Sequence, residues 1–232
     1  MLKTIEQIKI FCDSTVVQGP FKDLHVNFVD YWGPEDVALK WLGTYEQPIF
    51  PYIERELTQS HDIFINVGCG DGYYGAGIKK RNPEISISLF DINPQCKELV
   101  DSICVKNNIT DYKFSSICSP ETISADVRKA INPWLFVDIE GHEVDLLNIN
   151  IIPELSRATI TVEIHDCFRF GTTNELLARF QNTHTVTNIV DTFERKIPPL
   201  PSSIILEKDM LDFIRHERRG HRMNWLHMIP LR

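Results

Sequence analysis

The feature that most constrains the fold is an apolar run at residues 63–67 that leads directly into three alternate glycines, Gly68, Gly70 and Gly72. The run has the length of a buried strand. Because glycine has no Cβ atom, the chain after the strand can take positive φ angles and approach a ligand closely. About twenty residues on, Asp91 closes the next apolar run, where such folds set a carboxylate against ribose hydroxyls. The sequence therefore predicts a fold that holds an adenosine-bearing cofactor.

From residue 63 onward, segments with strand character alternate with segments of helical character. We expect strands at residues 63–67, 85–90, 113–117, 134–139, 158–164, 185–190 and 203–207. We expect helices at residues 46–58, 74–81, 95–107, 125–131, 143–148 and 173–180. The last two strands are joined by a proline-rich loop without a crossover helix, so the final strand should be antiparallel. The predicted fold class is α/β, a doubly wound, mostly parallel seven-stranded sheet with an antiparallel last strand.

Length and charge limit the possible partners. The 232 residues suit one α/β core, and the formal net charge of -8 disfavours general binding to nucleic acid. We see no apolar stretch long enough to span a membrane and no signal peptide, and the six cysteines form no C-x-x-C pair, so we expect a cytoplasmic protein. Residues 1–60 should form a helical and loop segment over the cofactor site. Residues 61–207 should form the core, and residues 208–232 a tail or cap.

The chain resembles the FkbM-type methyltransferases, a branch of the class I S-adenosylmethionine-dependent methyltransferases that mostly O-methylates sugars and related natural products. Four segments carry the resemblance: residues 43–46 (Gly-Thr-Tyr-Glu), residues 64–74, residues 138–143 (Asp-Ile-Glu-Gly-His-Glu) and residues 163–166 (Glu-Ile-His-Asp). The D-x-E-G-x-E block is the most specific of them. The resemblance implies S-adenosylmethionine as cofactor and, as substrate, a hydroxyl on a sugar, glycan or small metabolite.

The glycine turn also fits a second class of enzyme. Gly70, Gly72 and Gly75 satisfy the G-x-G-x-x-G spacing of nicotinamide-dependent oxidoreductases. In that fingerprint the first glycine directly follows the strand, and counting from Gly68 puts Tyr73 where the third glycine belongs. A large side chain there would hinder the close contact between helix and strand. S-adenosylmethionine is therefore the favoured cofactor, and a nicotinamide oxidoreductase is the alternative.

Several residues are expected to hold the cofactor. Asp91 should bind the ribose, Ile92 should flank the adenine, and Ser116 should reach the adenine edge. Glu46 should either fold over the amino-acid end of the cofactor or serve as an ordinary acid at the start of a helix. Asn66 stands where the family usually has an acid, so it can accept a hydrogen bond but brings no charge; a non-catalytic relative that serves as a binding or scaffold subunit is a further alternative. The full predicted cofactor set is Glu46, Asn66, Gly68, Gly70, Tyr73, Asp91, Ile92 and Ser116.

Candidate catalytic residues follow two neighbouring strands. Asp138 leaves a buried strand toward the cleft, while Glu163 and His165 lie on one side of the next strand, so the three side chains can converge. They suit proton removal from a hydroxyl by His165, oriented by Asp138 or Glu163. They equally suit a site for Mg²⁺ or Mn²⁺, or a helix-capped loop with a structural histidine. Glu143 is expected only to interact favourably with the partial positive charge at the N-terminus of its helix.

Overall fold

The computed structural model describes residues 2–26, 33–217 and 222–231. In these residues one sheet contains β1 (Ile63–Val67), β2 (Ser86–Phe90), β3 (Lys113–Ser115), β4 (Pro133–Val137), β5 (Thr159–Ile164), β6 (His184–Val190) and β7 (Asn224–Pro230). The strand order is β3-β2-β1-β4-β5-β7-β6. Strands β1 to β5 pair in parallel, and β7 lies antiparallel between β5 and β6. The predicted fold class, a mostly parallel seven-stranded sheet with an antiparallel last strand, is confirmed.

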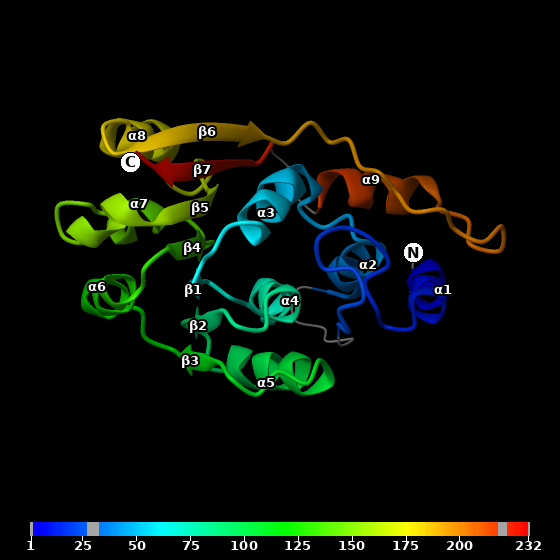
Figure 1. Cartoon of the computed structure of the whole chain (residues 1–232). Helices are drawn as coiled ribbons and strands as arrows, with labels where there is room; N and C mark the ends of the chain where they lie inside the picture. Colours follow the sequence, from blue (N-terminus) through cyan, green and yellow to red (C-terminus); the bar gives the residue numbers. More distant parts are fainter. Residues whose placement is uncertain (1, 27–32, 218–221, 232) are drawn as a thin grey trace.

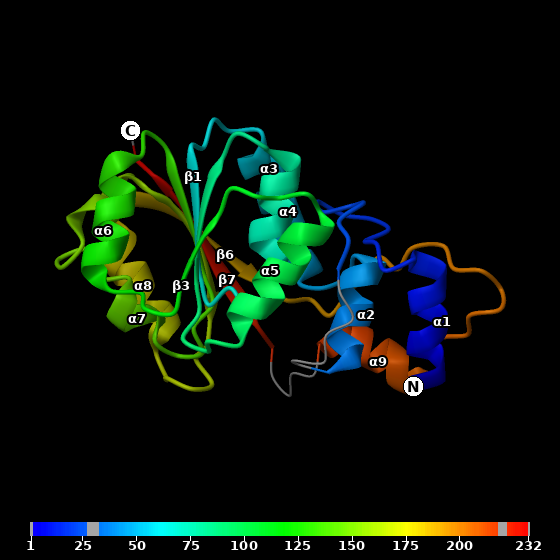
Figure 2. The ribbon, with the colours of Figure 1, turned by 90° about the horizontal axis from the view of Figure 1, so that it is seen from below.

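Helices cover both faces of the sheet (Figure 1). One face carries α6 (Pro120–Lys129), α7 (Glu143–Leu146) and α8 (Thr172–Phe180), and the other carries α3 (Phe50–Leu57), α4 (Tyr73–Arg81) and α5 (Cys96–Lys106). Beyond this second face, α1 (Leu2–Cys12), α2 (Pro34–Leu42) and α9 (Lys208–His216) form a helical lobe (Figure 2). Two short 3-10 helices are η1 (Gln47–Ile49) and η2 (Pro153–Arg157). The lobe therefore combines two helices from the start of the chain with α9, whereas the chain ends in the sheet, at β7.

The prediction of a strand at residues 203–207 was wrong. Ile204 in this segment is buried with the core on the lobe side, and Gln7 of α1 donates a hydrogen bond to the Ser203 carbonyl oxygen at 3.3 Å. Ile204 and Leu206 thus pack on the lobe-side core, and the segment does not join the sheet. The antiparallel strand is β7, which lies in the segment predicted as a tail or cap. Residues 27–32 and 218–221 of the two predicted terminal segments lie outside the described residues.

Two helix starts illustrate how local chemistry sets element boundaries. Helix α6 begins at Pro120, five residues before the predicted start, because the Ser119 hydroxyl accepts a hydrogen bond from the Thr122 amide at 3.3 Å. The predicted helix at residues 46–58 is divided into η1 and α3. Both its prolines lie in the first turns, where a missing N–H costs little.

A buried polar chain ties the lobe-facing side of the sheet together. The Glu56 carboxylate at the end of α3 bonds His61 Nε2 at 2.8 Å and His227 Nε2 at 3.2 Å. His227 Nδ1 lies 3.0 Å from the Thr161 hydroxyl, which also accepts a hydrogen bond from the Trp134 indole at 3.2 Å. Burial alone would raise the pKa of Glu56, but its hydrogen bonds with His227 and His61 lower that pKa to about 2. The carboxylate is therefore ionised and stabilising in the folded state.

Replacement of Glu56 should reveal this contribution. Because the folded pKa lies below the unfolded value of 4.5, ionised Glu56 stabilises the fold above pH 4.5, and this stability is lost as pH falls toward 2. We expect Glu56→Gln to lower the free energy of unfolding by about 3 kcal/mol at pH 7, and by progressively less as the pH falls. Urea denaturation from pH 7 to pH 3 measures this. Glu54→Gln is the control, because that exposed carboxylate makes a surface pair with Arg81. Equal losses in the two variants at pH 7 would contradict the prediction.

Candidate functional site

Three side chains meet where β4 and β5 end. Asp138, Glu163 and His165 each present an oxygen or nitrogen atom within 4.8 Å of the others. Glu163 and His165 are buried, whereas the Asp138 side chain is 27% exposed and so reaches the surface. The sequence placed these residues at neighbouring strand ends, and the structure brings their side chains together. Their catalytic role stays a prediction.

Glu143, not Asp138 or Glu163, holds the His165 ring. His165 Nδ1 lies 2.7 Å from Glu143 Oε1, which also accepts a hydrogen bond from the Gly141 amide at 2.9 Å. His165 Nε2 lies 3.3 Å from Glu140 and 3.7 Å from Asp138. The expectation that Glu143 merely favours a helix N-terminus is therefore incomplete, because its buried carboxylate orients the imidazole. Nε2 is left beside the carboxyl groups of Glu140 and Asp138.

The electrostatics of the site raise the pKa values of His165 and Asp138 and lower that of Glu143. Burial lowers the pKa of His165, but the hydrogen bond with Glu143 and the charges of Asp138, Glu143 and Glu140 outweigh it and raise that pKa above its ordinary value. Desolvation, together with the carboxylates of Glu163 and Glu46, raises the pKa of Asp138 well above its usual range. Burial also acts to raise the pKa of Glu143, but its hydrogen bond with His165 brings that pKa below normal. A charged Glu143 thus stabilises a protonated His165.

The glycine turn lies directly against this cluster. Gly68, Gly70 and Gly72 have φ angles of 78°, 52° and 82°. A Cβ atom at Gly68 would lie 1.5 Å from the Asp138 carbonyl oxygen, so no larger residue fits there. The Asp138 amide in turn donates a hydrogen bond to the Val67 carbonyl at 2.9 Å. The predicted cofactor turn and the predicted catalytic cluster are therefore adjoining parts of one site.

Asp91 fixes the outer side of the turn. Its carboxylate accepts hydrogen bonds from the Gly70 amide at 2.8 Å and from the Asn93 amide at 2.9 Å. The side chain is half-buried, and each carboxylate oxygen keeps a lone pair for a further donor. Beside it, Ile92 is 91% exposed, and Ser116 is exposed just past β3. These residues form an open rim at the ends of β2 and β3.

The remaining predicted cofactor residues are buried. The Tyr73 ring packs edge-on against Phe21 and Tyr45, with ring centres 5.2 Å and 6.1 Å apart, so it belongs to the core. Asn66 donates a weak hydrogen bond to the Phe136 carbonyl at 3.4 Å. Its Oδ1 atom is buried and has no hydrogen-bond partner within the described residues. A buried acceptor of this kind calls for a donor.

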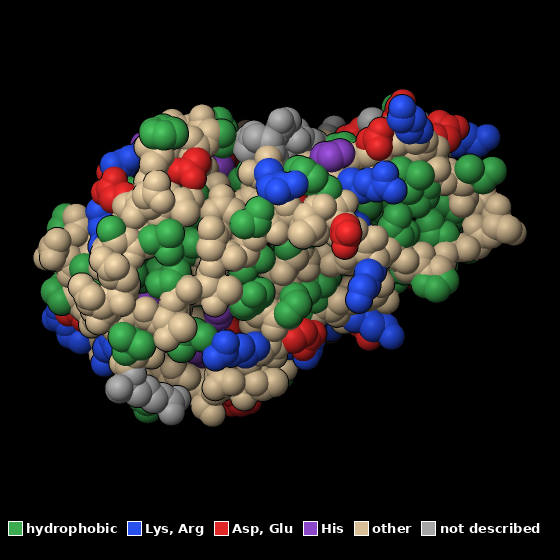
Figure 3. All heavy atoms as spheres, turned by 90° about the horizontal axis from the view of Figure 1, so that it is seen from above, with side chains coloured by type: hydrophobic (Ala, Val, Ile, Leu, Met, Phe, Trp, Pro, Cys, Tyr) green, Lys and Arg blue, Asp and Glu red, His purple; other side chains and the backbone are tan. Residues whose placement is uncertain are grey.

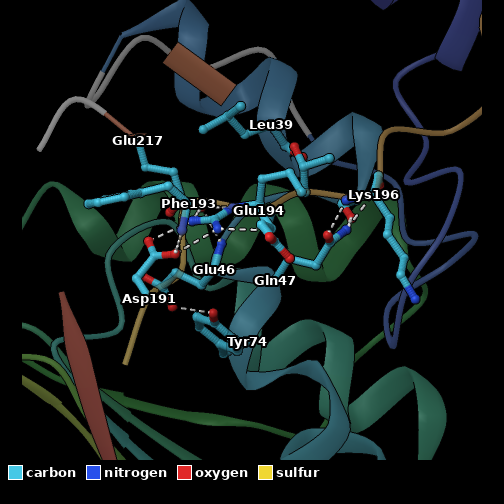
Figure 4. A network of polar contacts seen from close by, with 12 residues as sticks. Leu39, Glu46, Gln47, Tyr74, Asp191, Phe193, Glu194, Lys196 and Glu217 are labelled. Atoms are coloured by element: carbon cyan, nitrogen blue, oxygen red, sulfur yellow. Dashed lines mark hydrogen bonds and ion pairs between the residues drawn. The ribbon is translucent and has the colours of Figure 1, made fainter. Parts of the chain in front are cut away.

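Glu46 is held in a network that spans distant parts of the chain (Figure 4). Tyr74 donates a short hydrogen bond to its carboxylate, and the Glu46 amide donates to Glu217 Oε1 at 3.0 Å. Arg195, whose side chain is fully buried, pairs with Glu217 at 2.7 Å and with Asp191 at 2.8 Å. Both Glu46 and Glu217 adopt positive φ angles, which are strained for a non-glycine residue. Tyr74 of α4 thus fixes the Glu46 carboxylate, while Glu217, held by Arg195, fixes the Glu46 backbone.

Lys40 was not anticipated from the sequence. It lies on α2, is buried, and pairs at 2.6 Å with Asp71, the residue between Gly70 and Gly72. The lobe therefore also holds the glycine turn from outside. A lysine in an amphipathic helix gives no local signal of such a contact, because its partner lies 31 residues away.

Solved structures with a similar fold include several methyltransferases. The chain is similar to the METTL16 methyltransferase domain, with 13% identity, a TM-score of 0.56, and coverage of 99% of this chain and 98% of that one. It is similar to the human methyltransferase 10 domain containing protein, with 13% identity, a TM-score of 0.55 and the same coverage. It is also similar to the ribosomal protein L11 methylase from Lactobacillus delbrueckii subsp. bulgaricus, with 15% identity, a TM-score of 0.52, and coverage of 93% and 90%.

These likenesses show the fold. No protein-family model matches the sequence, and no curated protein matches it significantly. Among the described residues, no helix has both the length and the apolar character that crossing a membrane requires.

On the face that Figure 3 shows, Lys and Arg side chains are interspersed with Asp and Glu, and hydrophobic side chains gather over the helical lobe.

The hydrogen bond between Glu143 and His165 predicts how the imidazole titrates. We expect the pKa of His165 to lie above 6.5, and Glu143→Gln to lower it, because the amide cannot stabilise the imidazolium. Since the folded pKa is raised, the stabilisation is present below pH 6.5 and is lost as pH rises through the folded pKa. Titration of the histidine ring signals by NMR measures both values. Glu140→Gln, at the exposed edge of the same ring, is the comparison and should shift the pKa less. A His165 pKa that is the same in wild type and Glu143→Gln would contradict this assignment.

Proposed function

We propose that this protein is an S-adenosylmethionine-dependent methyltransferase that acts on a hydroxyl of a sugar, glycan or small metabolite. The observation that carries the proposal is the contact between the glycine turn and the catalytic cluster, where Gly68 adjoins the carbonyl oxygen of Asp138. A cofactor held by the turn would then lie next to the segment that carries Asp138. The similarity to methyltransferase structures and the D-x-E-G-x-E block support the same assignment.

The chemistry of the donor set fits this cofactor. Asp91 offers a half-buried carboxylate for ribose hydroxyls, and Asn66 offers a buried acceptor. Glu46, Asp138 and Glu163 supply carboxyl groups that suit a cationic sulfonium and ammonium group. When bound, S-adenosylmethionine supplies a strongly electrophilic methyl group. The protein's own task is then to align the acceptor and to remove its proton.

In this proposal His165 is the general base. Nε2 faces the mouth of the site, where it can accept the proton of an acceptor hydroxyl. Glu143 fixes the ring through Nδ1 and stabilises the imidazolium that forms. Asp138 lies 3.7 Å from Nε2, and desolvation raises the pKa of its carboxyl group, which would contact the acceptor oxygen. Because the pKa of His165 is raised, turnover should increase as the pH rises above 6.5.

Transfer of labelled methyl groups to a panel of acceptors tests this function. The panel contains neutral sugars, glycans, phenols, nucleotides, peptides and RNA, since proteins of similar fold include an rRNA methylase and a ribosomal protein methylase. We expect His165→Ala to lower kcat by about a hundredfold or more, with binding of S-adenosylhomocysteine unchanged. Cys167→Ala, at an exposed neighbouring position, should retain activity. Full turnover by His165→Ala would overturn the assignment of the base.

The same three side chains could instead hold a divalent cation. Two carboxylates and one imidazole are a possible ligand set, and such a cation would also acidify a bound hydroxyl. Mg²⁺ prefers oxygen ligands, whereas His165 contributes an imidazole nitrogen to this cluster. We therefore favour acid–base chemistry.

Removal of metal decides between the two. We expect turnover after dialysis against EDTA to remain within twofold of the untreated enzyme, and added Mg²⁺ or Mn²⁺ to leave it unchanged, because His165 needs no cation to accept a proton. Asp138→Asn supplies the comparison, since it keeps a hydrogen-bond donor but weakens a metal site. Loss of activity in EDTA, with recovery on adding Mn²⁺, would show that the cluster is a metal site.

A further inference from the structure

Two large aromatic side chains stand exposed in the loop between β5 and α8. Phe168 is 66% exposed and Phe170 is 98% exposed. The loop starts at His165, so both residues lie within five positions of the proposed base. Exposed aromatic side chains beside a polar site often mark a surface for binding.

The loop is firmly anchored at both ends. The amides of Phe168 and Arg169 donate hydrogen bonds to the His165 carbonyl oxygen at 2.9 Å and 3.0 Å. At the other end, the Asp166 carboxylate accepts hydrogen bonds from the amide and the hydroxyl of Thr173. Arg169 also pairs with Asp145 at 2.7 Å. The exposure of the two phenylalanines is therefore part of the folded geometry.

Phe168 contacts both catalytic segments. Its ring lies nearly parallel to the His165 imidazole, at 14° and with ring centres 5.7 Å apart. Its Cβ atom also lies against Gly141, where a Cβ atom would come within 3.0 Å, and Gly141 has a φ angle of 102°. The glycine of the D-x-E-G-x-E block thus makes room for Phe168. The aromatic ring is fixed beside the base and presents much of its surface to solvent.

Acidic side chains predominate around this ring among the described residues. Asp138, Glu140 and Glu143 surround the imidazole on which Phe168 stacks. The nearby cation, Arg169, is already paired with Asp145. A phosphorylated acceptor would bring further negative charge to this surface, which opposes its binding.

Resting on the proposed function, we propose that Phe168 and Phe170 form the acceptor-binding platform. The acceptor is then a neutral molecule with a flat, apolar ring face next to the reacting hydroxyl. A pyranose and a phenol share this chemistry, whereas sugar phosphates, nucleotide-sugars and nucleic acids do not. Phe168 positions the ring over His165, and Phe170 extends the platform outward.

The test compares acceptors that differ in charge and ring shape. Labelled methyl transfer is measured with methyl glucosides and simple phenols as neutral rings, glucose 1-phosphate and UDP-glucose as anionic rings, and sorbitol as an open chain. We expect methylation of at least one neutral ring, with kcat/KM at least tenfold above the anionic and open-chain compounds. Comparing turnover of the methyl glucosides with turnover of the phenols shows which of the two kinds of ring the protein accepts.

Variants then test the platform itself. Phe168→Ala should raise the KM of the best neutral acceptor about tenfold and change kcat less than threefold, because it removes stacking but not the base. Phe168→Tyr should restore the KM, and Phe170→Ala should raise it by a smaller factor. Phe11→Ala, on α1, is the control and should change neither value.

The possible outcomes distinguish a failure of the platform proposal from a failure of the proposed methyltransferase function. If the wild-type protein does not bind S-adenosylhomocysteine, the methyltransferase function itself is refuted. Intact cofactor binding with preference for an anionic acceptor, or with no turnover of any neutral ring, would overturn the platform proposal alone. An unchanged KM in Phe168→Ala, or an equal change in Phe11→Ala, would do the same.

Discussion

The contact between Gly68 and the carbonyl oxygen of Asp138 sets the spacing of the whole site. Strands β1 and β4 are neighbours in the sheet, and their carboxyl ends can approach this closely only because Gly68 has no side chain. The turn that follows β1 therefore lies against the segment that carries Asp138. This backbone contact joins the glycine turn to the cluster of Asp138, Glu163 and His165, and the proposed chemistry depends on that proximity.

Several acidic side chains lie around this contact, and hydrogen bonds hold them in position. Glu143 locks the imidazole of His165, and Tyr74 holds the Glu46 carboxylate, whose charge acts on Asp138. The helical lobe supports this arrangement from outside through its buried ion pairs. A pocket rich in carboxyl groups is costly unless a cation or a proton compensates it, so the site is suited to a cationic cofactor.

The sequence predicted those parts of the structure that depend on local patterns. Strand β1 was predicted with its observed bounds, because five consecutive apolar or buried residues end in a glycine turn. The position of β7 was not predicted, since residues 203–207 are as apolar as a strand and only tertiary packing places them on the lobe. The pairing of Glu143 with His165 also escaped prediction, because the two residues are 22 positions apart and meet only when α7 packs beside β5.

Calorimetric titration with S-adenosylhomocysteine tests the central claim most directly. The account predicts micromolar binding to the wild-type protein, at least tenfold weaker binding to Asp91→Ala, and no binding of NADH. Asp111→Ala, an exposed acid elsewhere on the surface, should bind as the wild type does. Binding of NADH with silence toward S-adenosylhomocysteine would contradict the account and identify a nicotinamide enzyme. Silence with both ligands would equally contradict it, and would show a methyltransferase fold that has lost its cofactor.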